Sequence, residues 1–198
     1  LKSDDISSFW KKEKRGSTIN SPISDGYYIT EEIKSTIPLT PEEKHDTLVW
    51  AMDKWIAGMM EACEGHVKAW DVVNEAIAGD GNDGGFYTLQ HGSADNANDF
   101  FWQDGMGDLE YVRQAVRLAR KHYAKSLEEK GGDDGQLKLF INDYNLESDW
   151  DNNHKVKSLI NWIKRWEEDG VTKIDGIGTQ MHISYYEDAK TLESKKNA

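Results

Sequence analysis

The chain is poor in several residue types, and each shortage narrows the class of protein. It contains one cysteine, Cys63, in 198 residues, so it cannot form an internal disulfide, and oxidising and reducing compartments both remain open. No apolar run approaches the roughly 20 residues that a membrane-spanning helix requires. Basic side chains number 24 against 36 acidic ones, for a formal net charge of −12. This deficit argues against a nucleic-acid partner, because affinity for phosphates depends on Lys and Arg.

The sequence pattern changes near Thr40 and divides the chain into two parts. Residues 1–39 mix charged residues with Ser, Gly and Pro, and they predict a loop or linker segment. Thr40 is followed by Pro41 and two glutamates, a capping box with proline at the first helical position. Residues 40–198 then alternate helical and strand-like patterns. This order predicts parallel strand–helix–strand units of an α/β fold.

Helical spacing of apolar residues predicts further helices at about Leu109–Glu129 and about Asn153–Asp169. In the second helix, Trp162 and Trp166 are four residues apart and share one side, where we favour core packing over stacking on a sugar. Gly79–Asn98 is rich in Gly, Asp and Asn and predicts a flexible loop. The acidic residues of that loop do not follow the spacing of a calcium-binding loop.

Three strand-like segments end in polar side chains. They are WDVVNE at 70–75, LKLFINDYN at 137–145 and IDGIGTQMHIS at 174–184. Gln180 and His182 are two residues apart, so both point to one side of a strand. A lone Asn-Glu pair would indicate an ordinary solvated strand end. Because the carboxyl ends of parallel strands face the ligand crevice, the three segments together predict one shared pocket.

These motifs carry a family resemblance. WDVVNE, FINDYN and GIGTQMHI are similar, in this order, to the fourth, fifth and sixth strands of the glycoside hydrolase family 10 barrel, the endo-1,4-β-xylanases. The resemblance implies that residues 40–198 form part of a (β/α)8 TIM barrel, incomplete in this chain. It also implies a retaining enzyme that hydrolyses xylan or xylo-oligosaccharides by double displacement, without a cofactor or metal. A secreted or cell-surface location follows from the same resemblance.

The resemblance assigns roles to residues of two strand ends. Glu75 corresponds to the general acid/base, and Asn74 to the amide that holds the 2-hydroxyl of the sugar undergoing cleavage. Gln180 and His182 are expected to line the same subsite. His182 is further expected to hydrogen-bond the nucleophilic carboxylate. A metal role for His182 is disfavoured, because no second His or Cys lies at ligand spacing.

On the leaving-group side of the cleft, the resemblance implies Tyr144 and Asn145. The family's nucleophile, a Glu in a T-E-L-D-like motif of the seventh strand, has no counterpart in these 198 residues. Retaining glycosidases need two carboxyl groups about 5–5.5 Å apart. We therefore expect another segment or chain to supply the nucleophile and the remainder of the barrel. By itself this chain is expected to be inactive.

Two alternatives accompany this interpretation. The first is another barrel β-glycanase, cellulase-like or mannanase-like, and the Q-M-H-I sequence at 180–183 favours xylan over it by resemblance. The second is a non-catalytic polysaccharide-binding fragment, and an intact Asn74–Glu75 pair argues against it. For residues 1–39, a linker that follows an inserted carbohydrate-binding module and a plain surface loop stay equally open.

Overall fold

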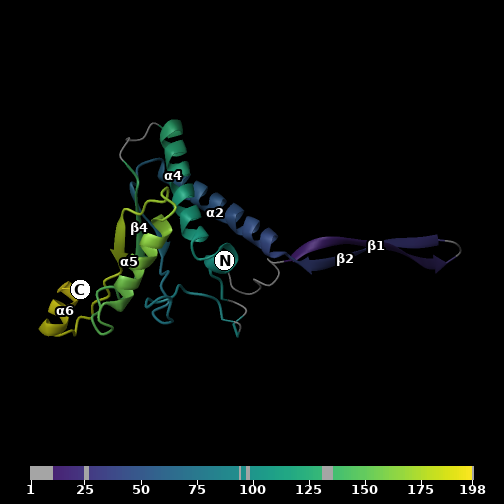
Figure 1. Ribbon diagram of the computed structural model, residues 1–198. Helices are drawn as coiled ribbons and strands as arrows, with labels where there is room; N and C mark the ends of the chain where they lie inside the picture. Colours follow the sequence, from purple (N-terminus) through teal and green to yellow (C-terminus); the bar gives the residue numbers. More distant parts are fainter. Residues whose placement is uncertain (1–10, 25–26, 94, 97–98, 131–135, 198) are drawn as a thin grey trace.

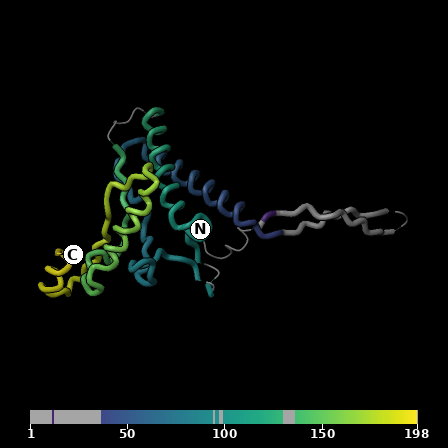
Figure 2. Tube along the Cα trace, viewed as in Figure 1, coloured from purple at the N-terminus to yellow at the C-terminus, as the bar shows by residue number. Residues whose placement is uncertain are grey.

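The computed structural model describes residues 11–24, 27–93, 95–96, 99–130 and 136–197 (Figure 1). Its elements are β1 (Lys11–Ser24), β2 (Tyr27–Pro38), α2 (Pro41–Cys63), β3 (Ala69–Asn74), α3 (Trp102–Met106), α4 (Glu110–Lys130), β4 (Lys138–Asp143), α5 (His154–Glu167), β5 (Gly176–Thr179) and α6 (Ala189–Asn197). Figure 2 follows the chain from α2 in blue through α4 to α6 in yellow. Among the described residues, no helix combines the length and apolar character that a bilayer crossing needs.

The N-terminal strands differ from the sequence-based expectation. β1 and β2 pair as an antiparallel hairpin, from Lys11 opposite Pro38 to Ser24 opposite Tyr27, that projects away from the helices (Figure 1). The expectation of a loop or linker over 1–39 is therefore wrong for the residues of β1 and β2, which form strands. Isoleucine, threonine and tyrosine recur through them and favour extended backbone, although charged residues mask the pattern. The domain boundary after residue 39 stays a prediction.

Helix α2 begins as its sequence predicts. Thr40 Oγ1 accepts a hydrogen bond from Glu43 N at 3.2 Å, and Glu43 Oε2 accepts one from Thr40 N at 2.9 Å. This reciprocal pair is the predicted capping box, with Pro41 in the first turn. The helix ends at Cys63, after which Glu64 takes a left-handed conformation with φ of 48°. Lys12 also hydrogen-bonds Glu43, which ties the hairpin to the start of the helix.

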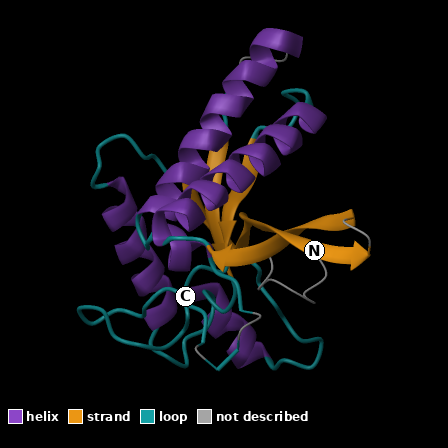
Figure 3. Cartoon of the chain, turned by 90° about the vertical axis from the view of Figure 1, so that its right-hand side faces the viewer, coloured by secondary structure: helices purple, strands orange, loops and turns teal. Residues whose placement is uncertain are grey.

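The three remaining strands form a parallel sheet in the order β3-β4-β5. Trp70 lies opposite Leu139, and Ile141 lies opposite Ile177. Helix α4 connects β3 to β4 and α5 connects β4 to β5, so the predicted α/β units are confirmed. Helix α4 packs against α2 and β3, and both long helices lie in front of the sheet in Figure 3.

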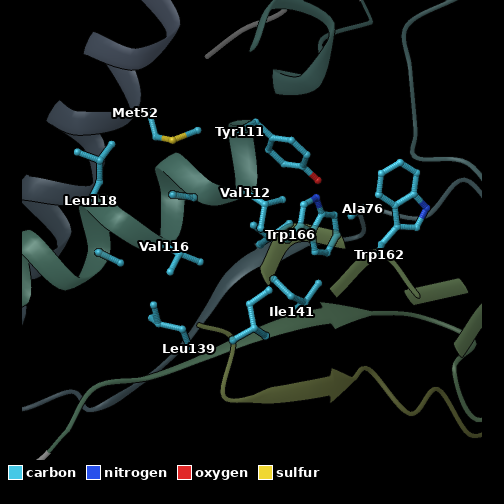
Figure 4. Packing of buried hydrophobic residues seen from close by; sticks show 14 of the residues in the cluster. Met52, Ala76, Tyr111, Val112, Val116, Leu118, Leu139, Ile141, Trp162 and Trp166 are labelled. Atoms are coloured by element: carbon cyan, nitrogen blue, oxygen red, sulfur yellow. The ribbon is translucent and has the colours of Figure 1, made fainter. Parts of the chain in front are cut away.

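The core lies between this sheet and its helices. Leu139 and Ile141 of β4 are fully buried, as are Trp162 and Trp166 of α5 (Figure 4). Trp162 Nε1 donates to the Tyr87 carbonyl at 2.9 Å, and Trp166 Nε1 donates to the Asp108 carbonyl at 2.8 Å. Both indole N–H groups are therefore satisfied inside the protein. Core packing of the two tryptophans, favoured from the sequence, is confirmed.

The glycine-rich segment after β3 is only partly the flexible loop that its composition predicts. Ile77 pairs with Leu89 in an antiparallel bridge, and Asp83 pairs with Phe86. Ile77 is 0% exposed and Leu89 is 1% exposed, so these two side chains anchor the segment in the core. The correction has a simple cause: two buried apolar residues outweigh the turn-forming residues between them.

Candidate active site

The predicted pocket forms at one edge of the parallel sheet. Strand β3 ends at Asn74, β4 at Asp143 and β5 at Thr179. Asn74 is paired with Asn142, and Asp143 is paired with Thr179, so the three carboxyl ends are aligned. This is the edge at which barrel and open α/β folds bind their ligands.

Glu75, immediately after β3, has an unusual backbone. Its φ is +56°, a left-handed conformation that costs a non-glycine residue about 1–2 kcal/mol. Two hydrogen bonds offset this cost. Glu75 N donates to the Asn142 carbonyl at 2.8 Å, and Gln90 Nε2 donates to the Glu75 carbonyl at 2.5 Å. The conformation leaves the Glu75 side chain half-buried at the edge of the pocket.

Four of the predicted site residues are joined by hydrogen bonds. Gln180 Nε2 donates to Glu75 Oε1 at 2.5 Å and lies 3.4 Å from Asn74 Oδ1. His182 Nε2 lies 2.8 Å from Gln180 Oε1, and because that oxygen can only accept, Nε2 carries a proton. Asn142 Nδ2 donates to Asn74 Oδ1 at 2.7 Å. Glu75 and His182 thus lie on the same side of the sheet edge, connected through one glutamine.

The segment that brings Gln180 and His182 together is not a strand, contrary to the expectation of a longer β5. The strand ends at Thr179, and Met181 has a φ of +47°. This left-handed residue turns the chain, the two flanking side chains bond each other, and Gln180 also bonds Glu75.

Tyr144 and Asn145 lie at the end of β4, as predicted. In the described part of the chain neither side chain is hydrogen-bonded to Glu75. The Tyr144 ring instead covers Lys155, whose Nζ lies 3.3 Å from the ring centroid. Asn145 has a φ of +58° and turns the chain toward α5. The structure thus places both residues beside the hydrogen-bonded group without joining them to it.

Sequence reasoning missed a buried ion pair beneath the site. Asp143 is 0% exposed, and its Oδ1 lies 2.8 Å from Nζ of Lys155. Its Oδ2 accepts from Ile77 N at 3.1 Å, and its Oδ1 accepts from Tyr144 N at 2.8 Å. One carboxylate therefore holds both the segment after Glu75 and the segment that carries Tyr144.

The sequence does contain a signal for this ion pair. Lys155 lies four residues before Leu159 and seven before Trp162, in phase with the apolar stripe of α5. A lysine within such a stripe indicates a buried cation that needs an anionic partner.

A groove of about 450 Å³ adjoins Asn74 and Glu75. Its other walls are mainly apolar and come from α2, β3 and the segment before α4, including Trp55, which is 70% exposed. Tyr111 also lines the groove, and burial raises the pKa of its phenol, so the group stays neutral. Apolar walls with a few polar groups at one end are typical of ligand sites.

Known proteins resemble the chain over most of its length. The sequence profile of glycosyl hydrolase family 10 matches residues 34–197. The endo-1,4-beta-xylanase A of Cellvibrio japonicus is 36% identical over 121 residues, which are 60% of this chain and 16% of that protein. The thermostable celloxylanase of Thermoclostridium stercorarium is 33% identical over 154 residues, 78% of this chain and 33% of that protein.

Solved structures share the fold. Xylanase B from Clostridium stercorarium F9 gives a TM-score of 0.51 at 28% identity, over 79% of this chain and 39% of that one. Xylanase 10B from Thermotoga maritima gives a TM-score of 0.50 at 30% identity, over 77% and 40% of the two chains. The chain spans a third or less of the length of the two curated relatives.

Proposed function

The chain belongs to glycosyl hydrolase family 10, and from this membership we propose that it provides the proton-donating side of a retaining endo-1,4-β-xylanase active site. The family fold is a (β/α)8 barrel, and β3, β4 and β5 with their helices are part of it. The observation that carries the proposal is the 2.5 Å hydrogen bond from Gln180 to the carboxyl of Glu75 at the sheet edge.

Glu75 acts as the general acid/base. In the first step its carboxylic acid protonates the glycosidic oxygen as a covalent glycosyl-enzyme forms, and in the second its carboxylate takes a proton from the attacking water. Gln180 holds the carboxyl in one orientation through Oε1. The other carboxyl oxygen is then the one that exchanges the proton with the substrate.

Asn74 binds the 2-hydroxyl of the sugar undergoing cleavage. Its Oδ1 faces the amides of Asn142 and Gln180, which sets the direction of the side chain. The amide nitrogen is therefore the end turned toward substrate, and its hydrogen bond strengthens as the transition state forms. Tyr144, backed by Lys155, lies with Asn145 on the leaving-group side.

The nucleophile comes from the remainder of the barrel, in another segment or chain. His182 is proposed to contact it: Nε2 is bonded to Gln180, and Nδ1 can donate to a carboxylate in the imidazolium form, in which both ring nitrogens carry protons. The sheet itself supports such a partner. Ile177 of the edge strand β5 is 37% exposed, whereas parallel sheets are normally covered on both faces.

Xylan is a polymer too large to cross a membrane, and we propose that the protein acts on it outside the cell or at the cell surface. The name of one relative, a celloxylanase, favours a second candidate substrate, a β-1,4-glucan. Activity on xylan and on carboxymethylcellulose, measured side by side with the full-length protein, distinguishes the two substrates.

The decisive variant is Glu75→Gln in the full-length protein, with Glu128→Gln on the exposed surface of α4 as the matched control. Loss of the proton donor should lower kcat on xylan by about 10²–10⁴-fold. Aryl xylosides with good leaving groups should lose much less in the first step, because their departure needs no proton. Unchanged xylan turnover by Glu75→Gln removes the residue from this role.

A further inference from the structure

We propose that Gln90 is a positioning residue for the acid/base. Its side-chain amide holds the main chain of Glu75 in the left-handed conformation that directs the carboxyl to Gln180. This inference rests on the proposed function, and it adds a residue that lies outside the three strand-end motifs. Gln90 belongs to the segment whose composition predicts only a flexible loop.

The conformation of Glu75 needs support on both sides. A glutamate with a φ of +56° relaxes to extended or right-handed backbone unless neighbouring groups hold it. On the N-terminal side, its N–H is bound to the carbonyl of Asn142 in β4. On the C-terminal side, its carbonyl accepts a hydrogen bond from Gln90 Nε2 at 2.5 Å. Rotation of this peptide would swing the Glu75 side chain away from Gln180.

Gln90 is itself held firmly. Its N–H donates to the Ala76 carbonyl at 2.9 Å, and the adjacent Leu89 pairs with Ile77 in the core. Its carbonyl accepts a hydrogen bond from the side chain of Gln103 in α3. Two glutamines in series therefore connect the backbone of Glu75 to a helix.

Helix α3 is a firm support for this arrangement. Gln103 is 6% exposed, and Gly107 N donates to its carbonyl at 2.7 Å, closing the helix end. The helix packs against both α2 and α4. Gln90 and Gln103 also line the groove that adjoins Glu75, so the connection lies along the wall of the candidate site.

The test compares Gln90→Met with Gln136→Met in the full-length protein. Methionine preserves the length of the side chain and removes the amide donor, and Gln136 is exposed at the opposite end of β4. Values of kcat/KM are measured on xylohexaose, whose leaving group needs a proton, and on a dinitrophenyl xylobioside, whose leaving group does not.

For Gln90→Met we expect a loss of roughly 10²-fold on xylohexaose and less than about 3-fold on the aryl substrate, because misplacing a catalytic group by an ångström costs about that much. Partial unfolding would lower both activities by the same factor. An equal loss on both substrates, or no loss, overturns the inference.

Gln103→Met is the second variant, and it should shift the same substrate ratio in the same direction by a smaller factor. Adding Gln90→Met to Glu75→Gln should leave that ratio unchanged, since Gln90 acts through Glu75. If Glu75→Gln retains full xylan activity, the proposed function fails. If Glu75→Gln is inactive on xylan and neither methionine variant changes the ratio, the inference about Gln90 fails alone.

Discussion

The two faces of the β3–β4–β5 sheet differ sharply. On one face Leu139 and Ile141 are 0% exposed and pack under α4 with the tryptophans of α5 (Figure 4). On the other, Phe140 and Asn142 are only partly buried, and β5 contributes only Gly176 and Gly178 beside them. Over β4 the first face is a closed protein interior, and it opens only at the edge strand, where Ile177 is 37% exposed. The second is covered less well by the residues that the structure describes.

This difference separates the packing that the chain forms by itself from the packing that other strands of the barrel would complete. The helix-covered face fixes the strands and the buried Asp143, which holds the segments carrying Glu75 and Tyr144. The less covered face corresponds to the inside of the barrel, where side chains from the other strands would pack. The residues proposed for catalysis lie where the two faces meet, so this chain positions their backbone, and the proposed mechanism draws its nucleophile from the rest of the barrel.

The largest stability effect is expected beneath the covered face. Lys155→Met leaves the Asp143 carboxylate buried without its cation and should lower the free energy of unfolding by about 3–5 kcal/mol. Lys157→Met, on the exposed side of the same helix, should change it by less than about 0.5 kcal/mol. Urea denaturation of the full-length protein measures both. A loss under 1 kcal/mol for Lys155→Met contradicts the role of the pair.

A matched pair of smaller changes compares the central strand with the edge strand on the helix-covered face. Ile141→Val should cost about 0.5–1.5 kcal/mol, as removal of one buried methylene does. Ile177 lies beside Ile141 on the same face but is 37% exposed. If the remainder of the barrel covers β5, Ile177→Val should cost a similar amount in the full-length protein. A loss near zero at Ile177, with the expected loss at Ile141, indicates that this edge of the sheet stays open to water.

The smallest expected effect is on thermal stability at acidic pH. Burial opposes the charge on Asp175, but a hydrogen bond from Leu139 N and the Arg120 guanidinium outweigh it, and the pKa of Asp175 is lowered. A lowered folded-state pKa stabilises the protein above the unfolded value of about 3.9, and this contribution is lost as pH falls below it. Asp175→Asn should therefore flatten the decline in Tm between about pH 5 and pH 3. Asp95→Asn, which is exposed, should leave that decline unchanged.

The sequence predicts the parts of the molecule that depend on neighbouring residues or on a repeated pattern. The capping box at Thr40 and the paired tryptophans of α5 were both accessible, because the partners lie three or four residues apart. Glu75 and Gln180 were brought together by parallel topology, although they are 105 residues apart. The residues that support the site could not be identified from the sequence. Gln90 has no periodic signal, since its importance comes from a main-chain carbonyl that no motif displays.

Asn74 explains why β3 ends in a carboxamide before the acid. Its oxygen accepts from two neighbouring amides, so the nitrogen end of the group is presented outward. An aspartate could accept the same two hydrogen bonds, but it would offer no N–H and would set a second negative charge beside Glu75. In the proposed mechanism, the polarity of this one uncharged side chain thus distinguishes the wall of the cleft that binds a sugar hydroxyl from the wall that transfers protons.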